Sequence, residues 1–136
     1  MSDAKDKIRV VCVEDEVEMI DLVTLILGKR GFEVVGAESG EAGLEAMSAR
    51  KPDLVLLDLM MPEMGGWEVF QQMKADEKLR DVPVIVVTAK ATSIDKVLGL
   101  HVAKVDDYIT KPFEPDELLS SVEKVLNLDK DTRVSA

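Results

Sequence analysis

Five side chains that follow short apolar runs carry groups that could act together on a phosphoryl group. They are three carboxylates, one hydroxyl and one ammonium: Glu14, Asp15, Asp58, Thr88 and Lys111. Three carboxylates in one place repel one another unless a cation lies between them. A ligand set of oxygens, without histidine or cysteine, suits the hard cation Mg²⁺ before Zn²⁺. A carboxylate nucleophile beside a divalent cation, an ammonium and a hydroxyl predicts phosphoryl transfer by positioning and charge neutralisation.

Each acidic residue also has a simpler structural explanation. Asp58 could cap the loop that follows it, and Glu14 and Asp15 could cap a helix whose N-terminus favours anions. Four separate segments contribute to the pattern, however, and their combination favours a site. The one cysteine, Cys12, lies inside an apolar run, and we expect it to be a small buried apolar residue.

Short apolar runs alternate with amphipathic stretches along the whole chain. The expected strands are residues 8–13, 32–36, 53–57, 84–87 and 108–109. The expected helices are residues 17–30, 40–50, 67–75, 93–102 and 115–126. This alternation predicts an α/β fold, the flavodoxin-like (βα)5 arrangement, with a parallel sheet of order 2-1-3-4-5 and helices on both faces. Sites in such sheets form beyond the carboxyl ends of the strands, where the five side chains fall.

The length and charge of the chain restrict its organisation and its partners. Its 136 residues fit one domain, and we expect a polar extension at 1–7, the domain at 8–126, and a polar tail at 127–136 without an effector domain. The apolar runs are too short to span a bilayer. The net charge of −10 opposes direct binding to nucleic acid and to anionic membranes. We therefore expect a soluble, cytoplasmic protein.

Four stretches of the sequence resemble the receiver domains of two-component response regulators, the CheY-like family. They read VEDE at 13–16, LLDLMMPEMGG at 56–66, VVTA at 86–89 and DDYITKPF at 106–113. The resemblance covers residues 8–126, and the four stretches occur in order at receiver-like spacing. It implies a stand-alone response regulator receiver in which Asp58 accepts a phosphoryl group from a histidine kinase.

The resemblance also implies roles for the residues around Asp58. Asp15, Asp58 and the backbone carbonyl of Met60 would bind Mg²⁺ directly, and Glu14 would reach the metal through water. Thr88 and Lys111 would contact the phosphoryl group. The flanking position of Met60 predicts an influence on the rate of dephosphorylation.

A switch from the phosphoryl group to a binding surface is implied as well. Thr88 would move toward the phosphoryl group and Tyr108 would then turn inward. This would change the surface formed by residues 93–102, strand five and residues 115–126, where a downstream protein partner binds. The resemblance further implies a cis peptide bond before Pro112.

Partners and activity follow from the same resemblance. The expected phosphodonor is a histidine kinase or a histidine phosphotransfer protein, and no activity is expected beyond the phosphorylation and dephosphorylation of the protein itself. Val97 and Ser121 stand where OmpR-type receivers carry basic dimer contacts. We therefore expect a monomer or a weak dimer.

Three alternatives remain open at this point. The receiver could be a phosphorelay intermediate that passes its phosphoryl group to a histidine phosphotransfer protein. A Mg²⁺-dependent phosphohydrolase of the haloacid-dehalogenase type would need a second Asp two residues after the nucleophile, where this chain has Met60. A flavodoxin-like electron carrier would need a phosphate-binding loop after the first strand, and the acidic residues Glu14, Asp15 and Glu16 oppose a flavin phosphate there.

Overall fold

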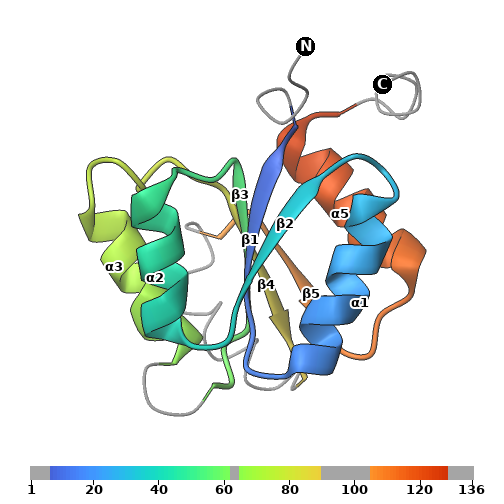
Figure 1. The fold of residues 1–136 in the computed structure, drawn as a ribbon, viewed down its shortest axis with the longest axis horizontal. Helices are drawn as coiled ribbons and strands as arrows, with labels where there is room; N and C mark the ends of the chain where they lie inside the picture. The colour runs from blue at the N-terminus through green and yellow to red at the C-terminus, as the bar shows by residue number, and fades with distance from the viewer. Residues whose placement is uncertain (1–6, 62–64, 90–104, 129–136) are drawn as a thin grey trace.

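A single parallel sheet forms the centre of the protein. The structure is a computed structural model that describes residues 7–61, 65–89 and 105–128. Within these ranges its strands are β1 (Arg9–Val13), β2 (Glu33–Ala37), β3 (Leu54–Leu57), β4 (Val84–Thr88) and β5 (Asp107–Thr110). All four strand pairs are parallel, and the order is β2-β1-β3-β4-β5 (Figure 1). The predicted fold and strand order are confirmed.

Helices cover both faces of this sheet. The described helices are α1 (Val17–Gly28), α2 (Gly40–Ala49), α3 (Gly66–Ala75) and α5 (Pro115–Leu126). α1 and α5 lie on one face, and α2 and α3 lie on the other (Figure 1). The helix expected at 93–102 lies outside the described residues, as do Val97 and most of the predicted terminal extensions. Across the described ranges, no helix combines the length and the apolar character needed to span a membrane.

The turn after α1 shows why this helix ends two residues before its predicted end. Gly31 adopts a φ of 88°, a left-handed conformation that a side chain would disfavour. The backbone N–H of Phe32 then reaches back to the carbonyl of Leu27 at 3.2 Å. The reversal therefore occupies residues that periodicity alone assigned to the helix, and β2 starts at Glu33 instead of residue 32.

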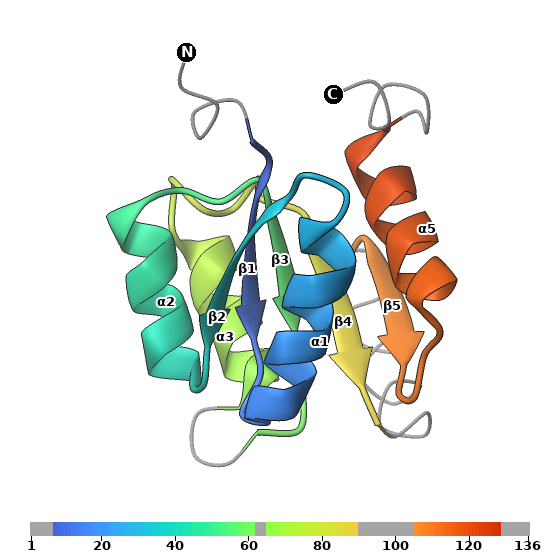
Figure 2. The ribbon, with the colours of Figure 1, turned by 45° about the vertical axis from the view of Figure 1, so that its right-hand side comes forward.

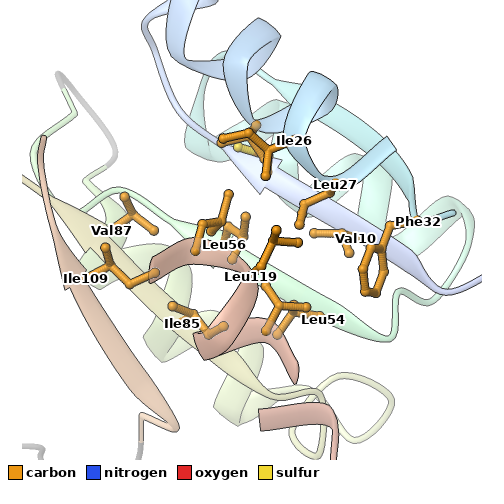
Figure 3. Packing of buried hydrophobic residues seen from close by; sticks show 14 residues of the cluster. Val10, Ile26, Leu27, Phe32, Leu54, Leu56, Ile85, Val87, Ile109 and Leu119 are labelled. Carbon is orange, nitrogen blue, oxygen red and sulfur yellow. The ribbon is translucent and has the colours of Figure 1, made fainter. Parts of the chain in front are cut away.

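Alternate residues of the strands fill two apolar layers, one under each pair of helices. Val10 and Cys12 of β1 pack toward α1 and α5, whereas Val11 and Val13 pack toward α2 and α3. Figure 3 shows the first layer, in which Ile26, Leu27 and Leu119 from the helices meet Val10, Leu54, Leu56, Ile85 and Ile109 from the strands. Cys12 is buried, as predicted. The layers hold the strand ends, and the residues beyond them, at fixed positions.

Candidate functional site

The carboxyl ends of β1, β3, β4 and β5 deliver the predicted side chains to one edge of the sheet. Figure 2 shows β1, β4 and β5 pointing toward this edge, below which α1 begins. Backbone hydrogen bonds fix the residues there: Asp58 N–H donates to Val13 at 3.0 Å, and Lys111 N–H donates to Thr88 at 2.9 Å. Glu14 N–H donates to Ala37 at 2.9 Å. The strand register thus extends one residue beyond β1, β3 and β5 and holds the site.

The three predicted carboxylates form one cluster. One ligand oxygen from each of Glu14, Asp15 and Asp58 lies within 4.8 Å of the others. Glu14 and Asp58 are only 2% and 4% exposed. A compact set of carboxylate oxygens, with no nitrogen or sulfur donor, fits the preference of Mg²⁺ for hard ligands.

An ammonium group lies inside this cluster. Lys111 Nζ is 2.7 Å from Glu14 Oε1 and 3.5 Å from Asp58 Oδ2. Burial alone would lower the pKa of Lys111, but the hydrogen bond to Glu14 and the charge of Asp58 outweigh it and raise this pKa. Burial, with the nearby charge of Asp58, raises the pKa of Glu14 to about 7. A second negative charge beside Asp58 is therefore costly, and a divalent cation would relieve that cost.

The backbone after Asp58 also contributes to the site. Met60 N–H donates to Asp58 Oδ1 at 2.9 Å, so one carboxylate oxygen is held by an amide while the other faces Lys111. The Met60 side chain is 45% exposed at this rim. The metal-binding role of its carbonyl stays a prediction. Met61 is buried in the layer under α2 and α3.

Gly66 supports Asp58 in a way that the sequence did not reveal. A Cβ atom at Gly66 would overlap with the carbonyl oxygen of Asp58 and crowd Leu59. The first turn of α3 therefore packs directly on the backbone of the nucleophile candidate. From the sequence we expected this helix to begin at residue 67, one residue after Gly66, and the glycine pair appeared only within the receiver-like motif.

Glu16 is a second residue that sequence reasoning left out of the site. Its Oε1 lies 3.6 Å from Lys111 Nζ, and its side chain is 65% exposed. The only available signal was a third acidic residue after Glu14 and Asp15. Spacing alone could not distinguish that residue from an ordinary N-cap of α1.

The two predicted switch residues lie on neighbouring strands. Thr88 is fully buried, and its Oγ1 has no hydrogen-bond partner among the residues that the structure describes. Tyr108 pairs with Val86 across the sheet, and its side chain is 48% exposed. It borders a hollow of about 310 Å³ that Thr110, Glu117 and other residues of β5 and α5 line. The outward position of Tyr108 leaves it room to turn.

Two further observations concern the residues near Lys111 and on β5. The Lys111–Pro112 peptide bond is cis, as predicted. Asp107 does not project freely from β5, because its Oδ2 accepts hydrogen bonds from Ser121 Oγ and from Lys124 Nζ at 3.1 Å.

Comparison with known proteins decides the family. The response regulator receiver domain family matches residues 10–123. The chain belongs to the response regulator receiver domains. Such domains interact with histidine kinases in two-component signalling. This assignment favours the receiver over the phosphohydrolase and electron-carrier alternatives.

Curated relatives at the sequence level are longer proteins. The chain is 39% identical over 123 residues to the DNA-binding response regulator MtrA of Mycobacterium tuberculosis, covering 90% of this chain and 52% of MtrA. It is 37% identical over 118 residues to the phosphate regulon transcriptional regulatory protein PhoB of Escherichia coli, covering 87% and 51%. The chain thus spans about half the length of these relatives. We expected that the protein does not bind nucleic acid directly, and the names of these relatives do not fit that expectation. The expectation that the receiver is a stand-alone protein is not confirmed.

Solved structures share the fold. Chemotaxis protein CheY4 of Vibrio cholerae superposes with a TM-score of 0.80 at 25% identity, over 88% of this chain and 98% of CheY4. The receiver domain of sensor histidine kinase PA1611 from Pseudomonas aeruginosa gives 0.80 at 26% identity, over 89% and 98%. The latter holds a magnesium ion coordinated in its active site cleft.

Proposed function

We propose that this receiver accepts a phosphoryl group on Asp58 from a phosphohistidine of a histidine kinase. The observation that carries the proposal is the buried ammonium of Lys111, held 2.7 Å from Glu14 and 3.5 Å from Asp58. An ion pair with a purely structural role would need one carboxylate, whereas the Lys111 ammonium lies within ion-pair distance of both Glu14 and Asp58. Because Lys111 already lies near Asp58 as well as Glu14, its charge can neutralise negative charge that a phosphoryl group adds at Asp58.

The transfer step uses groups that already surround Asp58. One carboxylate oxygen attacks the phosphorus, the phosphorus–nitrogen bond of the donor breaks, and its electron pair leaves with the imidazole. The Met60 amide orients the carboxylate, and Lys111 neutralises charge on the transferred group. The protein would act only on itself, by accepting the phosphoryl group and later losing it to water.

The acidic cluster would hold Mg²⁺ during this step. Asp15, Asp58 and the carbonyl of Met60 are the proposed direct ligands, and Glu14 is the proposed ligand through water. The support is the compact oxygen-only donor set, together with the pKa of Glu14, which burial and, to a lesser degree, the nearby charge of Asp58 raise. Bound Mg²⁺ would neutralise charge on the phosphoryl oxygens.

Output is proposed to pass through the face formed by β5 and α5. Thr88 Oγ1 is available for a new hydrogen bond to a phosphoryl oxygen, and Tyr108 is half exposed beside the hollow on that face. A coupled turn of these two side chains would alter the surface offered to a downstream partner. MtrA is named as a DNA-binding response regulator and PhoB as a transcriptional regulatory protein. The proposal therefore includes DNA or a protein of transcription as a downstream partner.

Phosphorylation by a small donor tests the proposal directly. With acetyl phosphate and Mg²⁺, intact mass should show one added phosphoryl group that hydroxylamine removes. Asp58→Asn should show none, and Asp15→Asn or chelation of Mg²⁺ should abolish the addition. Asp81→Asn, at an exposed position, is the matched control and should behave as wild type. A hydroxylamine-stable group, or one that persists in Asp58→Asn, would refute the assignment.

A further inference from the structure

Glu16 immediately precedes α1 and occupies the position that usually caps a helix. Its carbonyl accepts the N–H of Ile20 at 3.1 Å, as expected there. Its side chain makes no capping hydrogen bond, whereas Ser39 before α2 caps through the N–H of Ala42 at 3.1 Å. The Glu16 carboxylate is directed to Lys111 Nζ at 3.6 Å. The Glu16 side chain therefore pairs with the lysine of the acidic cluster and does not cap its own helix.

Glu16 also differs from Glu14 and Asp58 in its exposure. Glu14 and Asp58 are almost fully buried, but the Glu16 side chain is 65% exposed. A phosphodonor comes from solvent and has to approach Asp58 from the accessible side of the site. The exposed Glu16 carboxylate places a negative charge on that side, 3.6 Å from the same ammonium that lies 3.5 Å from Asp58 Oδ2.

We propose that Glu16 is a specificity-determining residue that selects phosphodonors by the charge of their leaving group. This inference rests on the proposed phosphorylation of Asp58. The carboxylate favours a donor whose imidazole ring carries a positive charge when it binds and leaves as neutral imidazole, and it disfavours a donor whose leaving group departs as an anion. A kinase phosphohistidine belongs to the first class, and acyl phosphates of metabolism belong to the second.

The bonds that break explain the difference. In phosphoimidazole protonated at its far nitrogen, the phosphorus–nitrogen bond breaks, the electron pair stays on nitrogen, and neutral imidazole leaves. The positive ring is attracted to Glu16 as it binds. In acetyl phosphate the phosphorus–oxygen bond breaks and acetate leaves with the negative charge, which Glu16 repels. In both cases the new bond joins phosphorus to an Asp58 oxygen.

The test measures the phosphorylation rate constant per donor concentration for phosphoimidazole and for acetyl phosphate in the same protein. In Glu16→Gln the acetyl phosphate rate should rise relative to the phosphoimidazole rate by about three- to fivefold, as expected for one exposed charge at short range. Glu18→Gln removes the same charge from the exposed first turn of α1 and should leave the ratio unchanged. High salt should shrink the effect of Glu16→Gln.

The possible outcomes separate the two proposals. If wild type takes no phosphoryl group on Asp58 from either donor, the proposed function fails. If wild type is phosphorylated but Glu16→Gln changes both rates equally, the donor selection is wrong while the acceptor role stands. If Glu18→Gln changes the ratio of the two rates as much as Glu16→Gln does, the overall negative charge of the protein explains the effect. That outcome would also overturn the inference. Unfolding curves of both variants check that the exposed substitutions leave the fold intact.

Discussion

The two edges of the sheet carry the same kind of residue and use it in opposite ways. At the carboxyl edge, Glu14 and Asp58 direct their side chains to Lys111 and to each other. At the amino edge, the carboxylates of Asp53 and Asp106 bind the backbone of a neighbouring strand. Both sets of residues continue a strand ladder through their backbone, so the difference lies in the side chains.

The amino edge shows one arrangement twice. Asp53 N–H donates to the Arg9 carbonyl at 2.8 Å, and Asp53 Oδ2 accepts the Arg9 N–H at 2.8 Å. Asp106 N–H donates to the Val84 carbonyl at 3.0 Å, and Asp106 Oδ2 accepts the Val84 N–H at 2.8 Å. Each aspartate thus closes a two-bond ring with the first residue of the adjacent strand. These rings fix the register of β1 with β3 and of β4 with β5.

The direction of the strands explains the contrast. Where parallel strands begin, unpaired N–H groups need acceptors, and a carboxylate satisfies them. Where the strands end, the unpaired groups of the strands are carbonyls, which cannot bind a carboxylate, and among the described residues only loop amides such as those of Met60 and Glu16 reach the carboxylates from the backbone there. Acidic residues at the carboxyl edge therefore need cations, from lysine or a metal ion. The same kind of residue thus fixes strand register at one edge and forms the candidate site at the other.

Alanine at the two ends of β3 gives the largest expected difference. Asp58→Ala should lose all phosphorylation, because the proposed acceptor oxygen is gone. Asp53→Ala should keep phosphorylation but lower the free energy of unfolding by about 1–3 kcal/mol, because the Arg9 N–H loses its acceptor. Mass spectrometry with acetyl phosphate and urea unfolding measure the two effects. Loss of phosphorylation in Asp53→Ala at unchanged fold would break the comparison.

Much of this contrast could be read from the sequence, and part of it could not. Alternating apolar runs placed Glu14, Asp58 and Lys111 at one edge, because strand direction follows from the fold. Period and spacing do not give the direction of a side chain, so the contacts of Glu16 and the ring of Asp106 remained hidden. Close backbone contacts, such as that under Gly66, depend on how a helix packs, which no local pattern encodes.

Gly66→Ala should have the second-largest effect. The added methyl group would overlap with the Asp58 carbonyl oxygen, so the backbone of α3 or of Asp58 has to move. We expect a loss of about 2–3 kcal/mol in the free energy of unfolding and slower phosphorylation. Gly28→Ala is the control, since a methyl group there meets nothing within 4 Å. It should leave stability unchanged or raise it, because alanine favours helices. If Gly66→Ala and Gly28→Ala lose similar amounts of unfolding free energy, the close contact between Gly66 and the Asp58 carbonyl is not the cause.

Asp106→Ala sharpens the comparison at the edge strand β5. Without its carboxylate the Val84 N–H loses its acceptor, and we expect a loss of about 1–2 kcal/mol in the free energy of unfolding. Amide exchange at Tyr108 should become faster, because β5 is held at that end by this ring. The exposed Asp81→Ala should change neither quantity. Unchanged exchange at Tyr108 would show that α5 alone holds the strand.

The smallest expected effect concerns Asp107, a carboxylate of β5 whose side chain binds neighbouring side chains. Its Oδ2 accepts hydrogen bonds from Ser121 Oγ and Lys124 Nζ. Burial alone would raise the pKa of Asp107, but these hydrogen bonds outweigh it and lower the pKa below the ordinary 3.8. Stability from this carboxylate is thus present above pH 3.8 and is lost as the pH falls through the lowered folded value.

Ser121→Ala tests this dependence on charge. At neutral pH we expect a loss of about 1 kcal/mol in the free energy of unfolding, because a buried hydroxyl no longer donates to the carboxylate. The difference from wild type should shrink as Asp107 becomes protonated in acid, and NMR titration should show the Asp107 pKa moving upward in the variant. Ser120→Ala, on the exposed side of α5, should do neither. If the loss in the free energy of unfolding stays constant down to strongly acidic pH, Ser121 stabilises the fold through packing. The lowered pKa of Asp107 would then come from Lys124 and not from Ser121.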